Sequence, residues 1–124
     1  MGNRSLVSVV DDDESVRESL PDLIRQFGFC ARAFPSAEAF LASESMSETR
    51  CLVLDIAMPG MSGPDLQQEL IRRRQQIPIV FITGAGDRAV RLRVLAQGAV
   101  ECLSKPFSET ALLDALNAAL RREL

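Results

Sequence analysis

The sequence predicts an α/β domain in which a five-stranded parallel sheet is covered by helices on both faces. Apolar segments of strand length alternate with segments of helical spacing, and the alternation continues to the end of the chain. Several of the apolar segments end directly in acidic or turn residues, which is typical of the carboxyl edge of such a sheet. All 124 residues are expected to form one domain, over 1–124.

Five segments have the composition of strands. Three are apolar runs, over residues 6–10, 51–54 and 77–82, as expected of parallel strands buried on both faces. The second strand is expected over residues 29–34, and the fifth is the short run 100–103. Each of them is followed by a helical segment, and five such units imply the parallel sheet.

The first helix is expected to be continuous although it contains a proline. Its apolar residues have helical spacing, and Gly28 is a suitable C-terminal stop. Pro21 lies inside this pattern, where it removes one backbone hydrogen bond. Because the apolar stripe continues through it, we expect a bend between Arg17 and Pro21 and not two helices. The stripe consists of Val16, Leu20, Leu23 and Phe27.

Capping residues predict where the other helices begin. A short helix is expected over residues 37–42, and the third begins after Ser62, with Asp65 completing a capping box, and ends in residues 72–74. Asp87 is suited to cap the fourth helix, which Gly98 would end, and Ser108 to cap the fifth. The fifth helix is expected to bury the stripe Leu113, Leu116, Leu120 and Leu124, while Leu112, Ala115 and Ala119 fit either the core or an interface.

Composition excludes several classes of function. The net charge of −3 argues against direct nucleic-acid contact by this segment, and no apolar run approaches the length of a membrane span. The chain has no histidine, which removes a histidine general base and a histidine metal site. Cys30, Cys51 and Cys102 lack metal-ligand spacing and are expected to be small buried residues in a reducing cytoplasm.

Side chains that bear chemistry follow the predicted strands. Asp11 and Asp12 follow the first strand, and Asp55 follows the third. In the flavodoxin-like strand order 2-1-3-4-5 these two strands are neighbours, so the three carboxylates are expected to meet. Such a cluster is unfavourable unless cations join it, and hard carboxylate oxygens suit Mg²⁺. A carboxylate can also be a phosphoryl acceptor. Thr83 and Lys105, which follow the fourth and fifth strands, would supply a hydroxyl and a cation.

The motifs resemble the receiver domain of bacterial two-component response regulators over essentially the whole chain. They are VDDDE at 10–14, LDIAMPGMSG at 54–63, TG at 83–84 and KPF at 105–107. The stretches SAEAFL at 36–41 and ITGAGD at 82–87 look most like the FixJ type of receiver, which usually precedes a helix-turn-helix DNA-binding domain.

The resemblance implies a role for each site residue. Asp55 would be the phosphoacceptor, and Mg²⁺ would be held by Asp11, Asp12, Asp55 and the backbone carbonyl of Ala57. Thr83 with Gly84 would bind the phosphoryl group and switch. Lys105 would be the family's cation, joined to Pro106 by a cis peptide bond. Asp13 and Glu14 are better explained as residues that favour a helix N-terminus.

The expected switch differs from the usual one. Many receivers carry Tyr or Phe where this chain has Cys102, so the response should run chiefly through the loop after Thr83 and the fourth helix. The contact surface would lie around Arg91, Val94 and Glu101, with the fifth helix nearby. It would serve a homodimer formed on phosphorylation, or an output domain outside this chain that acts in transcription regulation.

Two other functions are open to such a chain. One is a Mg²⁺-dependent phosphatase with an aspartate nucleophile, but the position of its general acid is occupied here by Ala57. The other is a pseudo-receiver that binds partners without phosphorylation, which the intact acidic, hydroxyl and lysine set argues against. The resemblance therefore favours a signalling domain, not an enzyme, that a sensor histidine kinase phosphorylates.

Overall fold

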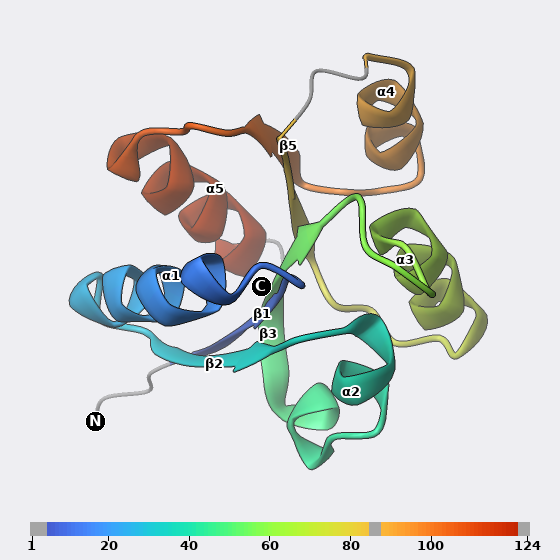
Figure 1. Ribbon diagram of the computed structural model, residues 1–124, viewed down its shortest axis with the longest axis horizontal. Coiled ribbons are helices and arrows are strands. Elements are labelled where there is room, and N and C mark those ends of the chain that lie inside the picture. Colours follow the sequence, from blue (N-terminus) through green and yellow to red (C-terminus); the bar gives the residue numbers. More distant parts are fainter. Residues whose placement is uncertain (1–4, 85–87, 122–124) are drawn as a thin grey trace.

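Five parallel strands form the centre of the molecule (Figure 1). The computed structural model describes residues 5–84 and 88–121, and within them the strand order is β2-β1-β3-β4-β5. Every neighbouring pair is parallel, so the predicted fold class and strand order are confirmed. The strands are β1 (Leu6–Val10), β2 (Cys30–Phe34), β3 (Thr49–Asp55), β4 (Ile79–Thr83) and β5 (Glu101–Ser104).

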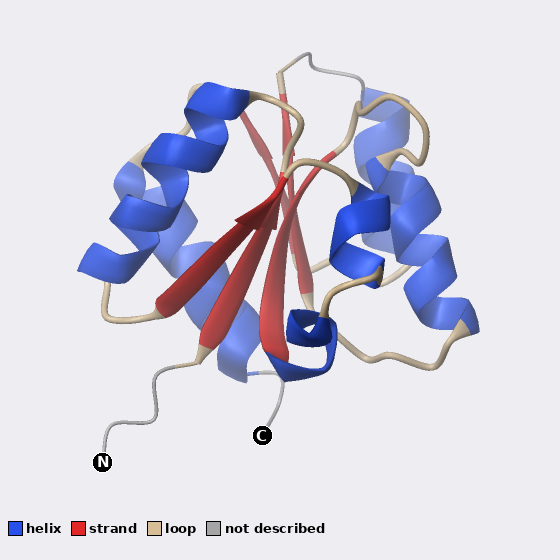
Figure 2. Ribbon diagram, turned by 60° about the horizontal axis from the view of Figure 1, so that its bottom comes forward, coloured by secondary structure: helices blue, strands red, loops and turns tan. Residues whose placement is uncertain are grey.

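Helices cover both faces of this sheet. The helix α1 and the helix α5 lie against one face, and α2, α3 and α4 lie against the other (Figures 1 and 2). Within the described residues, no helix is both long and apolar enough to cross a membrane. The helices are α1 (Glu14–Gln26), α2 (Ala37–Leu41), α3 (Gly63–Arg72), α4 (Arg88–Ala96) and α5 (Glu109–Arg121).

The two layers of helices bury two apolar clusters, one on each side of the sheet. Alternate residues of the central strands face opposite clusters: Val53 belongs to the cluster under α1 and α5, and Leu52 and Leu54 belong to the other. Phe40 of α2 is fully buried and meets Phe34 edge-to-face, with ring centroids 5.5 Å apart. The central strands are mostly apolar because both faces of the sheet are covered.

The predicted helix starts agree with the observed caps. The side chain of Ser62 accepts a hydrogen bond from the amide of Asp65, and the reciprocal bond completes the capping box. Ser108 accepts from the amide of Ala111 at the start of α5. Gly28 follows α1 with a φ of 101°, a left-handed conformation that glycine adopts without strain. The predicted cap at Asp87 lies outside the described residues.

Pro21 is buried inside α1, and the helix continues through it as a single element. The prediction of one helix is therefore confirmed. The apolar face of α1 explains why: Leu20 and Ile24 on either side of the proline belong to the cluster under α1 and α5.

A short 3₁₀ helix, η1 (Glu44–Glu48), was not predicted. It leads directly into β3, which begins at Thr49, two residues earlier than its apolar run. The buried hydroxyl of Thr49 donates to the carbonyl oxygen of Ser45 at 2.7 Å and lies 2.7 Å from the hydroxyl of Ser8. A buried threonine can thus begin this strand because its hydroxyl is paired.

The burial of the α5 stripe and of one cysteine differs from expectation. In α5 the buried positions are Leu112, Ala115, Leu116 and Ala119, so the three residues that fitted either the core or an interface belong to the core, and Leu116 of the stripe is buried as expected. Leu113 and Leu120 of the expected stripe are only half-buried, and Leu124 lies outside the described residues. Cys51 and Cys102 are buried as predicted, but Cys30 is exposed.

Candidate functional site

Strand register brings the predicted site residues to one edge of the sheet. Val10 pairs with Leu54, so the residues that follow them, Asp11 and Asp55, lie side by side. Thr83 is the last residue of β4 and pairs with Ser104, the residue before Lys105. All of these residues come from the carboxyl ends of neighbouring strands, where open α/β sheets bind their ligands.

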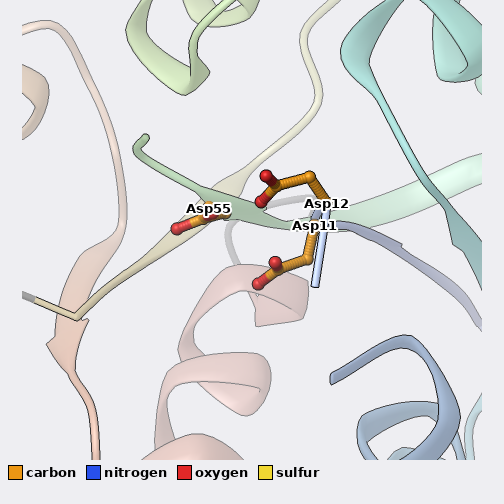
Figure 3. A group of neighbouring side chains, drawn as sticks. All are labelled: Asp11, Asp12 and Asp55. Carbon is orange, nitrogen blue, oxygen red and sulfur yellow. The ribbon is translucent and has the colours of Figure 1, made fainter. Parts of the chain in front are cut away.

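Three carboxylates form a tight cluster at this edge. One oxygen each from Asp11, Asp12 and Asp55 lies within 4.8 Å of the other two (Figure 3). Asp11 and Asp55 are buried and Asp12 is exposed, so the cluster has a dry side and a solvent side. Three oxygen ligands at this spacing fit a hard divalent cation such as Mg²⁺, which keeps several waters and uses few carboxylates.

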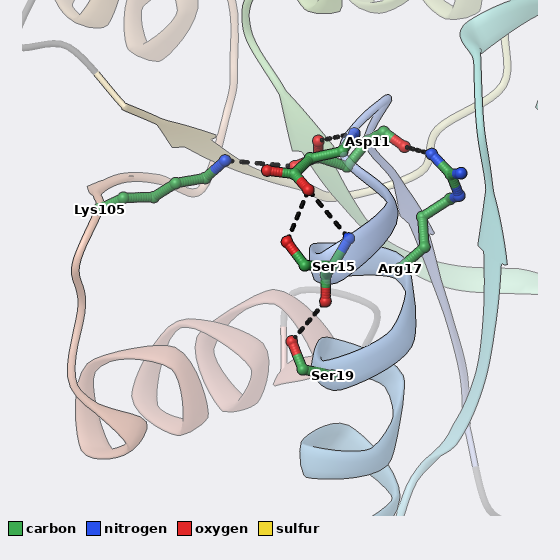
Figure 4. Close-up of polar contacts among 6 residues, drawn as sticks. Asp11, Ser15, Arg17, Ser19 and Lys105 are labelled. Atoms are coloured by element: carbon green, nitrogen blue, oxygen red, sulfur yellow. Dashed lines mark hydrogen bonds and ion pairs between the residues drawn. The ribbon is translucent and has the colours of Figure 1, made fainter.

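Asp11 is fixed by contacts on three sides. Its carboxylate accepts from the amide of Asp13 at 2.9 Å and forms an ion pair with Lys105 Nζ at 3.4 Å (Figure 4). Its backbone carbonyl accepts from the guanidinium of Arg17 at 3.0 Å. The Asp11 side chain is fully buried, while that of Lys105 is 30% exposed. The lysine thus compensates part of the buried negative charge.

The surroundings of Asp55 strongly disfavour the ionised form of its carboxyl group. Burial and the negative charge of Asp11 raise its pKa from 3.8 to about 6. Lys105 and the backbone amide of Ala57 act in the opposite direction, and Asp12 adds to the increase. At neutral pH Asp55 is therefore ionised but poorly compensated, which favours the binding of a cation.

The glycine after the capping serine is a residue to which sequence reasoning gave no role. A Cβ on Gly63 would lie 2.3 Å from the backbone oxygen of Asp55 and 3.0 Å from Ile56 Cα. Its amide donates to the carbonyl of Ile56 at 2.9 Å. The start of α3 therefore packs directly on the backbone that carries Asp55. A glycine at the first position of a predicted helix was the available signal.

The residues around Lys105 connect β4 and β5 beyond their last pair. The amide of Lys105 donates to the carbonyl of Thr83 at 2.8 Å, and the Lys105–Pro106 peptide bond is cis, as the resemblance implied. Thr83 is half-buried, and the next residue, Gly84, is exposed. Ala57 is exposed beside the cluster, and its carbonyl stays a predicted ligand.

Cys102 lies in the apolar cluster under α4, and not in the acidic site. It is fully buried, and this burial raises the pKa of its thiol. Its backbone carbonyl accepts from Arg91 of α4 at 2.6 Å, and its amide donates to the side chain of Glu101 at 2.9 Å. Val94 is also fully buried, which corrects its assignment to a contact surface.

Asp13 and Glu14, which follow Asp11 and Asp12, lie at the N-terminus of α1, as predicted. Asp13 is the N-cap of α1: its carboxylate accepts from the amide of Ser15 at 2.9 Å and from the Ser15 hydroxyl at 2.7 Å. Glu14 lies in the first turn of the helix. These two carboxylates stabilise the helix start, and the other three form the cluster that could hold a cation.

The fold and the site together define a doubly wound α/β domain with an acidic cluster, flanked by a lysine, at the sheet's switch point. Residues 7–117 match the family described as the response regulator receiver domain. The chain belongs to this family, and its relatives place it with receivers of the FixJ type.

Similar proteins include several response regulators. The chain is 48% identical to nodulation protein W of Bradyrhizobium diazoefficiens, over 97% of this chain and 53% of that protein. It is 38% identical to the transcriptional regulatory protein FixJ of Azorhizobium caulinodans, over 94% of this chain and 55% of that protein. The chain therefore spans about half the length of the curated relatives it matches.

Solved structures show the same architecture. The response regulator StyR superposes with a TM-score of 0.89 at 48% identity, over 97% of this chain and 61% of that one. The structure of FixJ-N superposes with a TM-score of 0.87 at 37% identity, over 98% of this chain and 96% of that one.

Proposed function

We propose that this domain is a phosphorylation-controlled signalling receiver that accepts a phosphoryl group on Asp55. The observation that carries the proposal is the convergence of three carboxylates beside Lys105 in a chain of the receiver family. Asp55 is the member of that cluster that ends the central strand β3. On one side of β3 lie β4 and β5, the strands that end in Thr83 and lead to Lys105.

Mg²⁺ is the cofactor that the donor set fits. Asp11, Asp12 and Asp55 would hold it, together with the carbonyl of Ala57. When bound, the ion supplies positive charge that neutralises the phosphoryl oxygens. The raised pKa of Asp55 supports this assignment, because a bound cation would compensate both the burial of the carboxylate and its repulsion from Asp11.

The chain's own residues divide the chemistry between them. An oxygen of the ionised Asp55 carboxylate attacks the phosphorus of the donor, the donor's bond to phosphorus breaks, and the leaving group departs with that electron pair. Lys105 then balances charge on the phosphoryl oxygens, and the Thr83 hydroxyl donates a hydrogen bond to one of them. Asp11 keeps Lys105 at the site through their ion pair.

Intact-mass spectrometry with a small acyl phosphate or phosphoramidate and Mg²⁺ tests this proposal. One phosphoryl group per chain is expected, and Asp55→Asn should abolish it. Asp13→Asn is the matched control, because this neighbouring acid caps α1 and asparagine caps equally well. Unchanged labelling of the Asp55→Asn chain would overturn the assignment.

A phosphate-release assay beside the labelling experiment separates the alternatives. A phosphatase would release phosphate from a phosphate monoester over many turnovers, whereas a receiver takes one phosphoryl group from the small donor and then loses it slowly. A pseudo-receiver would take no label at all. Ala57 offers no acid for the protonation of a leaving group, which supports the receiver.

We infer that this domain acts in a cytoplasmic two-component pathway, with one partner that donates the phosphoryl group and another that responds to it. A sensor histidine kinase would supply the phosphoryl group. The relatives are about twice as long and several are named as transcriptional regulators, which supports an output domain outside this segment. The surface of α4, β5 and α5 would carry the switch, through that domain or through a phosphorylation-dependent homodimer.

A further inference from the structure

A cleft opens at the end of the sheet opposite the acidic site. It has a volume of about 690 Å³ and lies where β1, β2 and β3 begin, beside the end of α1. Apolar side chains of Leu6 and Phe29 form part of its lining. A volume of this size is typical of sites for small molecules.

Positive charge dominates the charged lining. Arg25, Arg32 and Arg50 contribute three guanidinium groups, and Glu48 contributes the one carboxylate among the described lining residues. The whole chain carries a net charge of −3, so the cleft is of opposite sign to the molecule as a whole. Clustered guanidinium groups repel one another unless an anion lies between them.

Two of the arginines are held in place by hydrogen bonds, and one of these two, Arg25, is also ion-paired with Asp22. Arg32 donates to the hydroxyl of the buried Ser45 at 2.6 Å, and Arg25 donates to the carbonyl of Ala31 at 2.8 Å and to Asp22 at 3.0 Å. A guanidinium has five N–H donors, so these bonds orient each group and leave donors for a ligand. Ordering the arginines beforehand reduces the entropy that binding would otherwise cost.

We propose that this cleft binds a small organic anion that bears carboxylate or phosphate groups. Guanidinium groups match the planar geometry of carboxylates and the oxygens of phosphates, and the apolar wall of Leu6 and Phe29 accommodates a carbon skeleton. The site is separate from the acidic cluster and does not depend on phosphorylation of Asp55.

Cys30 provides a reporter for occupancy. It lines the cleft and is exposed, whereas Cys51 and Cys102 are buried. The reporter reaction is disulfide exchange: the Cys30 thiolate attacks the reagent's sulfur, the reagent's disulfide bond breaks, and a coloured thiolate leaves. Two reagents are compared, the dianionic dithiobis-nitrobenzoate and the neutral dithiodipyridine, in EDTA and without a phosphodonor.

Citrate and inorganic phosphate should slow labelling by the neutral reagent to a plateau, beyond the effect of potassium chloride at the same ionic strength. The arginines should attract the dianionic reagent, so the ratio of its labelling rate to that of the neutral reagent should be high. Arg32→Gln should lower this ratio of rates about fivefold. Arg50→Gln should do the same, while Arg93→Gln, which removes an exposed arginine of α4, should change nothing. Cys30→Ser should abolish the rapid phase.

Protection no greater than that of chloride, or protection that survives in both Arg32→Gln and Arg50→Gln, would overturn the proposal. Amide chemical shifts of the unmodified chain titrated with citrate give a measurement that needs no variant. Shifts at Leu6, Ala31 and Glu48 are expected, and shifts confined to Asp11 and Lys105 would refute a site in the cleft.

Discussion

Replacing Asp55 by asparagine should stabilise the metal-free domain at neutral pH. Asp55 has a pKa of about 6 in the folded chain, against an ordinary value of 3.8. The folded state therefore binds the proton more tightly than the unfolded state, and stability is lost as the pH rises from about 4 through about 6. A shift of this size corresponds to about 3 kcal/mol above that window.

Asparagine has nearly the shape of aspartate but carries no charge, so Asp55→Asn removes this cost. At pH near 7.5 in EDTA its free energy of unfolding should exceed that of the unmodified chain by about 2 to 3 kcal/mol, with a melting temperature about 10 °C higher. The advantage should shrink below pH 6 and vanish near pH 4, where the aspartate is protonated in both states.

Urea denaturation at several pH values measures this difference. Asp114→Asn is the matched control, because it removes an exposed carboxylate of α5, and its effect should stay within about 0.5 kcal/mol. Adding Mg²⁺ should stabilise the unmodified chain more than Asp55→Asn and so narrow the gap. Equal stability of the two chains at neutral pH in EDTA, or an advantage that persists at pH 4, would refute the electrostatic reasoning.

Three further perturbations test the surroundings of the site. Gly63→Ala should cost about 2 to 4 kcal/mol in urea denaturation, because its Cβ meets the Asp55 backbone oxygen at 2.3 Å, whereas Gly84→Ala, with no atom within 4 Å, should be nearly neutral. Asp12→Ala should weaken Mg²⁺ binding in calorimetry and leave metal-free stability equal or higher; a clear loss of stability would contradict this. Ser62→Ala should lower the free energy of unfolding by about 1 kcal/mol, and no change would show that the capping box contributes little.

The convergence of the three carboxylates could be predicted from the sequence because it depends on topology. Apolar runs define the strands, and parallel strands place their carboxyl ends at one edge. Asp11 and Asp55 therefore had to be neighbours once β1 and β3 were adjacent. The Lys105–Asp11 ion pair, by contrast, needed the structure, because it depends on how a long side chain crosses β3 and β4 to reach the first strand.

The wrong expectations concern choices that only packing makes. In α5, the sets that include Leu112 and Leu113 both have helical spacing, and contact with the sheet selects the first. Cys30 begins the edge strand β2 and is exposed there, although cysteine is usually a buried residue. The close approach of Gly63 depends on the path of the loop after Asp55, which no periodicity encodes.

In each of the two edge strands of the sheet, an arginine side chain donates a hydrogen bond to one backbone carbonyl. At β5 the carbonyl of Cys102 accepts from Arg91, and at β2 the carbonyl of Ala31 accepts from Arg25. An open edge is a template on which another chain can add a strand, and these side chains occupy part of that template. A protein that extended the sheet would first have to displace a guanidinium from a backbone oxygen. Association through helix faces would meet no such barrier, so these two guanidinium groups disfavour edge-to-edge aggregation in particular.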